Sequence, residues 1–254
     1  MEENDYLQRI LHKYESRDLY TYSYQISRLK EIIVNWASGY LIEIKNSGSR
    51  AKYTSISMAS DLDLFISISH LCPFPLNEIY DSLYETLCCY YSSVRKQNVS
   101  VRVNINGLSV DVTPAKQQSS SSNFHSLYVS KSNTWKQTNI QKHIDDISSS
   151  NYIDDIKLLK IWRELHNLDF PSIYLEYLVI KELLVYDFSS GFHFLSILRK
   201  LADPSASNPL YKRLVDPANS NNVLSELLGI KEKQNIIKKA KDSLSKKYWK
   251  EILW

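Results

Sequence analysis

The stretch from Ser47 to Phe65 reads S-G-S-R-A-K-Y-T-S-I-S-M-A-S-D-L-D-L-F and carries the most informative pattern in the chain. It opens with the small residues Gly48 and Ser49, and its two aspartates, Asp61 and Asp63, stand at the head of an apolar run. Side chains two positions apart on a strand share one face. We therefore expect the two carboxylates to project side by side from the start of a buried strand.

The paired acids call for a cation. Two carboxylates this close repel each other, and each is driven toward protonation unless a positive charge compensates. Mg²⁺ suits such a pair because it takes one or two carboxylates and completes its octahedron with water and substrate phosphates. Gly48 lets the backbone approach a phosphate and Ser49 adds a hydroxyl donor. The same pattern also fits a solvated acidic strand edge, so the choice depends on residues further downstream.

A hairpin pattern places a third acid. Apolar residues alternate on both sides of Asn106-Gly107, which is the strongest short-range signal for a hairpin turn. Asp111 then faces away from the apolar positions of its strand, and Arg102 lies opposite it if the turn has two residues. Acids on strands are rarely buried unless they are paired or bind a metal. Two carboxylates from one strand and a third from another are what a two-metal phosphoryl-transfer site requires.

The spacing of apolar residues predicts a mixed first half and a helical second half. In the first half we expect helices over 20–36 and 76–95, strands over 40–44 and 61–69, and a flexible serine-rich connection over 115–134. In the second half we expect helices over 152–165, 173–187, 192–201, 223–228 and 230–253. The predicted fold class is α/β with two lobes: a mixed β-sheet catalytic domain over 1–145 and a mainly helical domain over 146–254.

Composition excludes several classes of protein. The 254 residues are 43% hydrophobic and 23% charged, as in an ordinary globular protein, and no apolar run is long enough to cross a bilayer. The acidic start M-E-E-N-D lacks the apolar core of a secretory signal. The three cysteines fit reduced thiols better than a disulfide framework. We therefore expect a cytoplasmic monomer without a membrane partner.

The net charge of +3 is concentrated near the end of the sequence. Residues 231–254 carry eight lysines against three acids, so the rest of the chain is slightly negative. This distribution argues against a globally basic nucleic-acid binder. The lysine-rich segment could bind RNA phosphates, but a solvated face on a packed helix is the more ordinary explanation.

Taken together, Gly48-Ser49, Asp61-x-Asp63 and Asp111 resemble the fingerprint of the DNA polymerase β superfamily of nucleotidyltransferases. Three more segments narrow the resemblance to the oligoadenylate synthetases and, most closely, to the bacterial cGAS/DncV-like nucleotidyltransferases (CD-NTases). These segments are L-L-K-I-W at 158–162, P-S-I-Y-L-E at 171–176 and V-D-P-A-N-S-N-N-V at 215–223. The last is similar to a turn that archaeal CCA-adding enzymes also carry, with Ser220 where that turn often has proline.

The resemblance implies a two-lobed nucleotidyltransferase fold and a role for each acid. Asp61, Asp63 and Asp111 would bind two Mg²⁺ (or Mn²⁺) ions, and Asp111 would also help to deprotonate the attacking hydroxyl. Gly48 and Ser49 would donate to the β- and γ-phosphates of the nucleotide.

Three residues of the second half complete the implied nucleotide site. Lys160 would neutralise the triphosphate as a point charge, Ser172 would add a phosphate contact, and Tyr174 would stack on a base. Each has a plain alternative: Lys160 as a surface lysine beside a core tryptophan, and the other two as capping or core residues.

The implied function is the joining of NTPs, ATP among them, into a cyclic or linear oligonucleotide second messenger of anti-phage (antiviral) defence. One alternative is a template-independent transferase that adds nucleotides to an RNA or tRNA 3′ end, and others are a nucleotidylating toxin and a nucleotide-binding regulator without chemistry. RNA would then be an acceptor or an activator. CCA-adding enzymes carry long additional domains for tRNA, whereas this chain has only a short basic segment, which favours the synthase. The presence of all three acids argues against the regulator.

Overall fold

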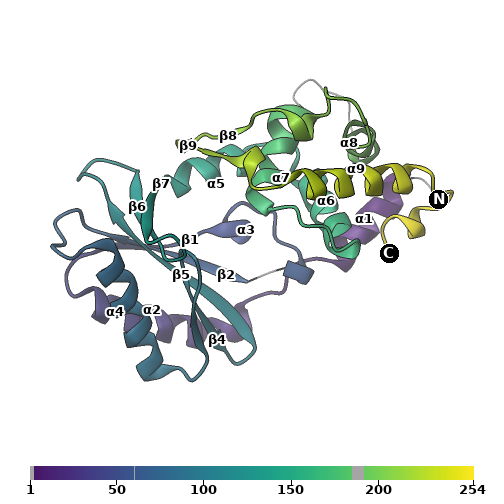
Figure 1. Cartoon of the computed structure of the whole chain (residues 1–254). Helices are drawn as coiled ribbons and strands as arrows, with labels where there is room; N and C mark the ends of the chain where they lie inside the picture. The colour runs from purple at the N-terminus through teal and green to yellow at the C-terminus, as the bar shows by residue number, and fades with distance from the viewer. Residues whose placement is uncertain (1–2, 60, 185–191) are drawn as a thin grey trace. The chain divides into compact units, whose positions relative to one another are not determined.

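A computed structural model describes residues 3–59, 61–184 and 192–254, which fold into two compact units (Figure 1). The sheet unit comprises Arg17–Lys52 and Ser60–Asp145. The helical unit comprises Met1–Ser16, Tyr53–Ala59 and Asp146–Trp254. The chain therefore passes between the units four times. The predicted division after residue 145 differs in two segments, because 1–16 and 53–59 fold with the helical unit.

The described part of the sheet unit is built on one mixed sheet in the order β1-β2-β5-β4-β3, which β6 and β7 extend from β5. Only β2 and β5 run parallel, and the other paired strands are antiparallel. A crossover that contains α4 (Leu76–Tyr90), β3 and β4 makes the parallel pairing feasible. The strands are β1 (Leu41–Asn46), β2 (Leu62–Ile68), β3 (Val94–Lys96), β4 (Val101–Ile105), β5 (Leu108–Gln117), β6 (His125–Val129) and β7 (Thr134–Thr138).

One face of this sheet packs against α2 (Ser23–Ala37) and α4, as Figure 1 shows. Both helices bury apolar side chains at helical spacing, and alternate residues of β2, β4 and β5 meet them in one core. The shared core includes Leu29, Ile33, Leu83 and Leu87 from the helices and Leu62, Leu64, Val101, Val103, Val110 and Val112 from the strands. The intervening strand positions therefore point to the opposite face, and that face carries the acids.

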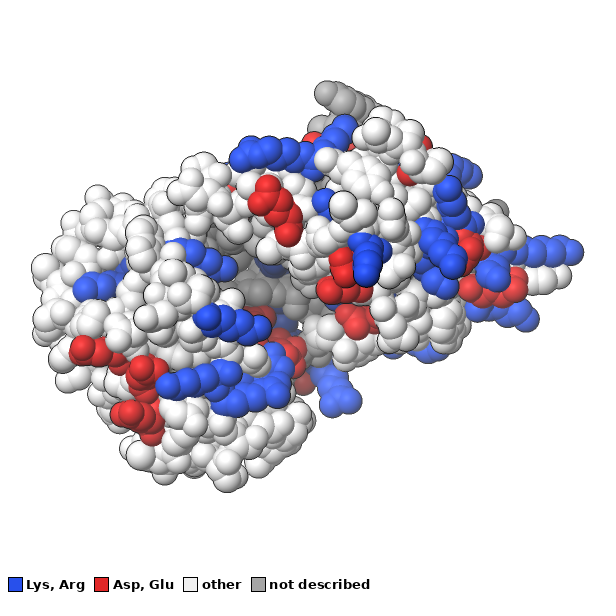
Figure 2. Space-filling model, viewed as in Figure 1, with Lys and Arg blue, Asp and Glu red and all other residues white. Residues whose placement is uncertain are grey.

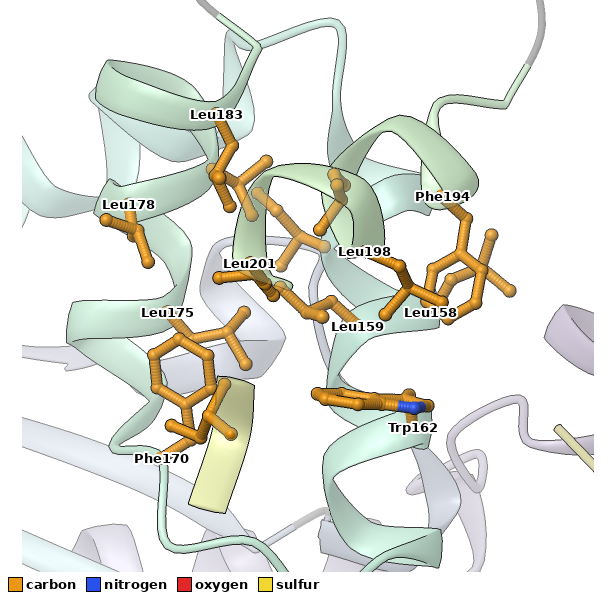
Figure 3. Close-up of a cluster of buried hydrophobic side chains, with 14 of the residues drawn as sticks. Leu158, Leu159, Trp162, Phe170, Leu175, Leu178, Leu183, Phe194, Leu198 and Leu201 are labelled. Carbon is orange, nitrogen blue, oxygen red and sulfur yellow. The ribbon is translucent and has the colours of Figure 1, made fainter. Parts of the chain in front are cut away.

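The helical unit has its own core, built around α6 (Ile153–Leu165) and α7 (Ser172–Leu178). Figure 3 shows apolar side chains of α6, α7, the π-helix η3 (Val179–Leu183) and α8 (Phe194–Leu201) interdigitating around Trp162. The Trp162 Nε1–H donates to Ser243 Oγ at 2.9 Å, which fixes α6 to α9 (Ile230–Leu244). The unit also contains α1 (Glu3–Lys13), η2 (Ser57–Ala59), η4 (Pro209–Tyr211), β8 (Val215–Asp216), β9 (Asn219–Val223), η5 (Leu224–Glu226) and η6 (Trp249–Glu251).

Several expectations are confirmed. The fold class is α/β, with a mixed sheet in one unit and mainly helices in the other. Ile105 pairs with Leu108, and the turn residues Asn106 and Gly107 have φ values of 52° and 89°, as a two-residue hairpin requires. In the described part of the chain no helix combines the length and apolar character needed to cross a membrane.

Other boundaries were wrong. The segment 115–134 is not a flexible loop, because β5 continues to Gln117 and β6 follows at His125–Val129. The helix expected over 76–95 ends at Tyr90, where the chain turns into β3. The helix expected over 223–228 is instead the end of β9 followed by η5, and α9 ends at Leu244. Of the helix expected over 173–187, α7 and η3 cover the part to Leu183, and residues 185–187 lie outside the described residues.

Candidate active site

Asp63 and Asp111 are direct neighbours on the parallel strands β2 and β5. Paired strands lie about 4.8 Å apart, so the two carboxylates lie close together on one face. The sequence determines the face on which each acid lies, because Leu62, Leu64 and Val110 all face the helix-covered core. Because successive side chains point to opposite faces of a strand, burial of the leucines and valines places the acids on the other face of the sheet.

The Gly48 loop packs directly against Asp63. The Ser47 N–H donates to the Asp63 carbonyl oxygen at 2.9 Å, which fixes the start of the loop to β2. Gly48 then adopts a φ of +62° and begins the one-turn helix α3 (Gly48–Ala51). A Cβ at this position would lie 1.8 Å from Asp63 Oδ2. Two features therefore require glycine at position 48: the left-handed backbone conformation and the Asp63 carboxylate that packs against it.

Arg102 on β4 is the counter-ion of the acids. It is the antiparallel partner of Asp111, as a two-residue turn predicts. Its Nε donates to Asp111 Oδ1 at 2.7 Å and its Nη2 to Oδ2 at 2.5 Å, while Nη2 also lies 2.8 Å from Asp61 Oδ2. These contacts place Asp61, which precedes β2, on the same face as the other two acids. The hydrogen bonds to Asp111 raise the pKa of the guanidinium, which stays charged.

One arginine does not balance the negative charge of this cluster. Burial raises the pKa of Asp63 to about 6, and the neighbouring Asp111 and Asp61 add to the increase, against the opposing effect of Lys52. A carboxyl group whose pKa is raised mainly by burial and further by neighbouring acids is not fully compensated by the cations around it. The arrangement therefore favours an additional cation beside Asp63.

The donor set fits a hard divalent ion such as Mg²⁺. Among the described residues no group of three or more His, Cys, Asp or Glu side chains is already arranged to hold a metal. In this structure Arg102 engages Asp111 and Asp61. The chemistry nevertheless agrees: the site offers carboxylate oxygens on adjacent strands and a raised Asp63 pKa, which a divalent cation would lower. Asp61, Asp63 and Asp111 are the residues that would hold such ions.

Arg50 adds a feature of its own beside the loop. Its Nε and Nη2 atoms are buried and make no hydrogen bond to the described residues. Burial lowers the pKa of Arg50, and the charge of Asp63 acts in the opposite direction. Buried donors without partners are costly, and an anion bound at the Gly48–Ser49 loop is a chemical group that would satisfy them.

The other expected site residues lie in the helical unit, where Lys160 is deeply buried. Its Nζ pairs with Glu176 Oε1 at 2.6 Å and donates to Thr54 Oγ1 at 2.8 Å. Thr54 in turn donates to Glu176 at 2.7 Å, and the Lys160 and Glu176 side chains are 2% and 0% exposed. Lys160 is thus already paired with a carboxylate of this unit. Its expected role in binding the triphosphate stays a prediction.

Ser172 and Tyr174 also have partners within the helical unit. The Ser172 hydroxyl accepts from Arg163 Nη1 at 2.9 Å. The Tyr174 ring is fully buried in edge contact with Phe170, and its hydroxyl donates to the Leu210 carbonyl at 3.1 Å. Stacking of Tyr174 on a base would require this packing to open, and the nucleotide contacts of both residues stay predictions.

Sequence reasoning missed the Thr54–Lys160–Glu176 network and the strand β3. Glu176 was visible as an acid on an otherwise apolar helix face, one helical turn after Ser172, and such an acid needs a buried partner. The short strand Val94–Lys96 gave little signal, because three residues cannot show a period-two alternation. Its consequence, the position of Arg95 beside Arg102, was therefore invisible.

No protein-family model and no curated protein sequence matches the chain. Solved structures do. CdnC of Escherichia coli MS115-1, solved with ATP, is 22% identical with a TM-score of 0.70, over 94% of this chain and 89% of that one. The CdnE cyclic dinucleotide synthase of Elizabethkingia meningoseptica, solved with GTP and Apcpp, is 14% identical with a TM-score of 0.68, over 97% of this chain and 100% of that one. The CD-NTase CdnG of Bradyrhizobium diazoefficiens, solved with GTP, is 10% identical with a TM-score of 0.66, over 95% and 91%.

These similarities define the fold. The chain has the two-lobed fold of the CD-NTases along nearly its whole length, as the sequence resemblance predicts. Three independent CD-NTases share it at low sequence identity, so the agreement concerns the arrangement of the backbone.

Proposed function

We propose that the protein is a metal-dependent nucleotidyltransferase that joins NTPs into a cyclic or linear oligonucleotide second messenger. The observation that carries the proposal is the pairing of Asp63 with Asp111 on adjacent strands, with the Gly48 backbone packed against Asp63. Its setting in a CD-NTase fold supports the choice of reaction, and the neighbours solved with ATP or GTP support NTPs as substrates. A role in anti-phage defence belongs to the proposal through the family resemblance alone.

Each group has a role in this reaction. A ribose hydroxyl of the acceptor nucleotide attacks the α-phosphorus of the donor, the bond to the β-phosphate bridge breaks, and pyrophosphate leaves. Asp111 accepts the hydroxyl proton, and the loop at Gly48 and Ser49 donates N–H and O–H groups to the departing phosphates. Two divalent ions held by the three acids would supply charge neutralisation and activation of the attacking oxygen. Arg50 adds positive charge beside the loop.

The test is synthesis by the purified protein. The protein is incubated with a mixture of the four NTPs in which one at a time carries an α-³²P label, with Mg²⁺, Mn²⁺ or EDTA, and the products are treated with phosphatase and resolved by chromatography. We expect a phosphatase-resistant product with either ion and none in EDTA. Asp61→Asn/Asp63→Asn should lower synthesis at least about a thousandfold, since the double change removes the two paired carboxylates.

The matched control is Asp81→Asn. Asp81 is an exposed acid on α4 that pairs with Lys96, so it lies on the helix-covered side of the sheet and should not affect synthesis. Label that appears only in added tRNA or RNA would replace the synthase by the RNA-end transferase, and label in protein would indicate a nucleotidylating toxin. Equal synthesis by the wild type and the double variant would refute the catalytic role assigned to Asp61 and Asp63.

A further inference from the structure

A polar pocket of about 440 Å³ lies at the β3 edge of the sheet unit, next to the acids whose counter-ion, Arg102, is part of its lining. Its lining comes from the connection between α4 and β3 and from β3, β4 and β5. The side chains that matter for its chemistry are Ser93, Arg95, Arg102, Asn104 and Ser109. The lining contains two arginines, several hydroxyls and no carboxylate, which is the composition of an anion site.

The strand register connects this pocket to the acids. Arg95 pairs with Arg102 between β3 and β4, Arg102 pairs with Asp111, and Asp111 pairs with Asp63. Directly paired residues share one face of a sheet, so the four side chains form a single row. At about 4.8 Å per strand, Arg95 lies roughly 10 Å from Asp111 along this row. The row continues past Asp63 to Ser47, where the phosphate-binding loop begins.

The two arginines of the row differ in what they bind. Arg102 is committed to the carboxylates of Asp111 and Asp61. Arg95 is exposed and makes no ion pair or hydrogen bond with its side chain to the described residues. Figure 2 shows Lys and Arg beside Asp and Glu on the visible face of both units. Arg95 is therefore the arginine of this pocket whose side chain has no acidic partner among the described residues.

The acceptor nucleotide supplies an anion at a suitable distance. Its attacking hydroxyl must lie at Asp63 and Asp111, and its own 5′-phosphates are only a few bonds from that hydroxyl. The phosphates of the donor occupy the loop at the opposite end of the row in the proposed scheme. We propose that the pocket at Arg95 binds the 5′-phosphates of the nucleotide whose hydroxyl attacks, so that the row holds the donor phosphates at one end and the acceptor phosphates at the other.

This proposal rests on the proposed function, and its test is a binding experiment that needs no turnover. Wild type, Arg95→Gln and Arg28→Gln are titrated calorimetrically with each NTP and with adenosine in EDTA. Arg28 is the matched control because it is an exposed arginine on α2, which covers the opposite face. We expect Arg95→Gln to weaken the binding of at least one NTP about tenfold, because the variant loses a charge-assisted hydrogen bond to a phosphate. Adenosine should bind all three proteins equally.

A second readout separates a specific role from a loss of structure. Circular dichroism should show the same melting temperature for Arg95→Gln and wild type, because Arg95 is exposed. With Mg²⁺, Arg95→Gln should raise the KM for NTPs several-fold and leave kcat within about twofold, as expected for uniform binding. Unchanged NTP binding by Arg95→Gln would overturn the proposal, and so would weaker binding of single-stranded RNA with NTP binding intact. Absence of any synthase product would refute the proposed function and leave this binding result interpretable.

Discussion

Gly48 is a position where the candidate site leaves no space for a side chain. We expect Gly48→Ala to abolish detectable synthesis and to lower the free energy of unfolding by about 1–3 kcal/mol, because the new Cβ meets Asp63 Oδ2 and the backbone keeps a φ of +62°. The measurements are product formation and urea unfolding in EDTA. Gly39→Ala is the control, since Gly39 has a φ of +89° but an added Cβ meets no atom within 4 Å.

The two variants separate backbone strain from steric contact. Both should lose stability through the left-handed φ, and only Gly48→Ala should lose the site. Full synthesis by Gly48→Ala would show that Asp63 can move away from the loop without consequence, contrary to the arrangement described above.

Three acids and the loop could be predicted from sequence because each depends on short-range rules. The period of two places Asp63 and Asp111 on the polar faces of their strands, and the Asn106-Gly107 turn fixes Arg102 opposite Asp111. The pairing of Asp63 with Asp111 could not be derived from these rules. It depends on the parallel register of β2 and β5, which a long crossover sets and local sequence does not encode.

Helices α6 and α7 are joined by the buried ion pair between Lys160 and Glu176, and this pair determines how a substitution of Lys160 affects stability. Lys160→Met leaves Glu176 buried without a cation, so we expect a loss of about 3–5 kcal/mol in the free energy of unfolding. Lys160→Met/Glu176→Met removes both charges and should recover most of that loss. The measurement is urea unfolding, together with synthesis at a temperature where all variants are folded.

The double variant distinguishes the two readings of Lys160. If Lys160 only stabilises the helix pair, the double variant should regain synthesis along with stability. If Lys160 also binds the triphosphate, synthesis should stay low in a stable protein. A stable Lys160→Met single variant would contradict the buried pair itself.

Elements with a strong period were predictable, and those defined by tertiary contacts were not. Helices α2 and α6 and strand β2 carry apolar residues at regular spacing over two turns or more, or over a full strand. Strands β6 and β7 lie in a polar, serine-rich segment and gain their pairing from β5, so composition indicated a loop. The change from α7 to the π-helix η3 has no counterpart in the apolar pattern.

At the scale of the whole molecule, the helical unit is not a contiguous piece of sequence. Its core includes Leu7 and Ile10 from α1 and Ile56 from the segment 53–59. We expect the fragment 146–254 alone to show no cooperative thermal transition, because it loses these side chains and the Thr54 hydroxyl that contacts Lys160. The measurement is circular dichroism on heating, with the full chain as the control. A cooperative transition of the isolated fragment would support the simpler division after residue 145.

The four passages of the chain between units also bear on how such proteins can be recombined. Exchange of the helical unit between two proteins of this fold would need junctions near residues 16, 52, 59 and 145. One of the exchanged pieces, 53–59, lies between Gly48 and Asp61, inside the stretch that carries the proposed active site. A single crossover in the gene would therefore join mismatched pieces of both units. Diversification of this architecture is consequently expected through point substitutions in matched lobes, and designed chimeras should treat residues 1–16 and 53–59 as part of the helical module.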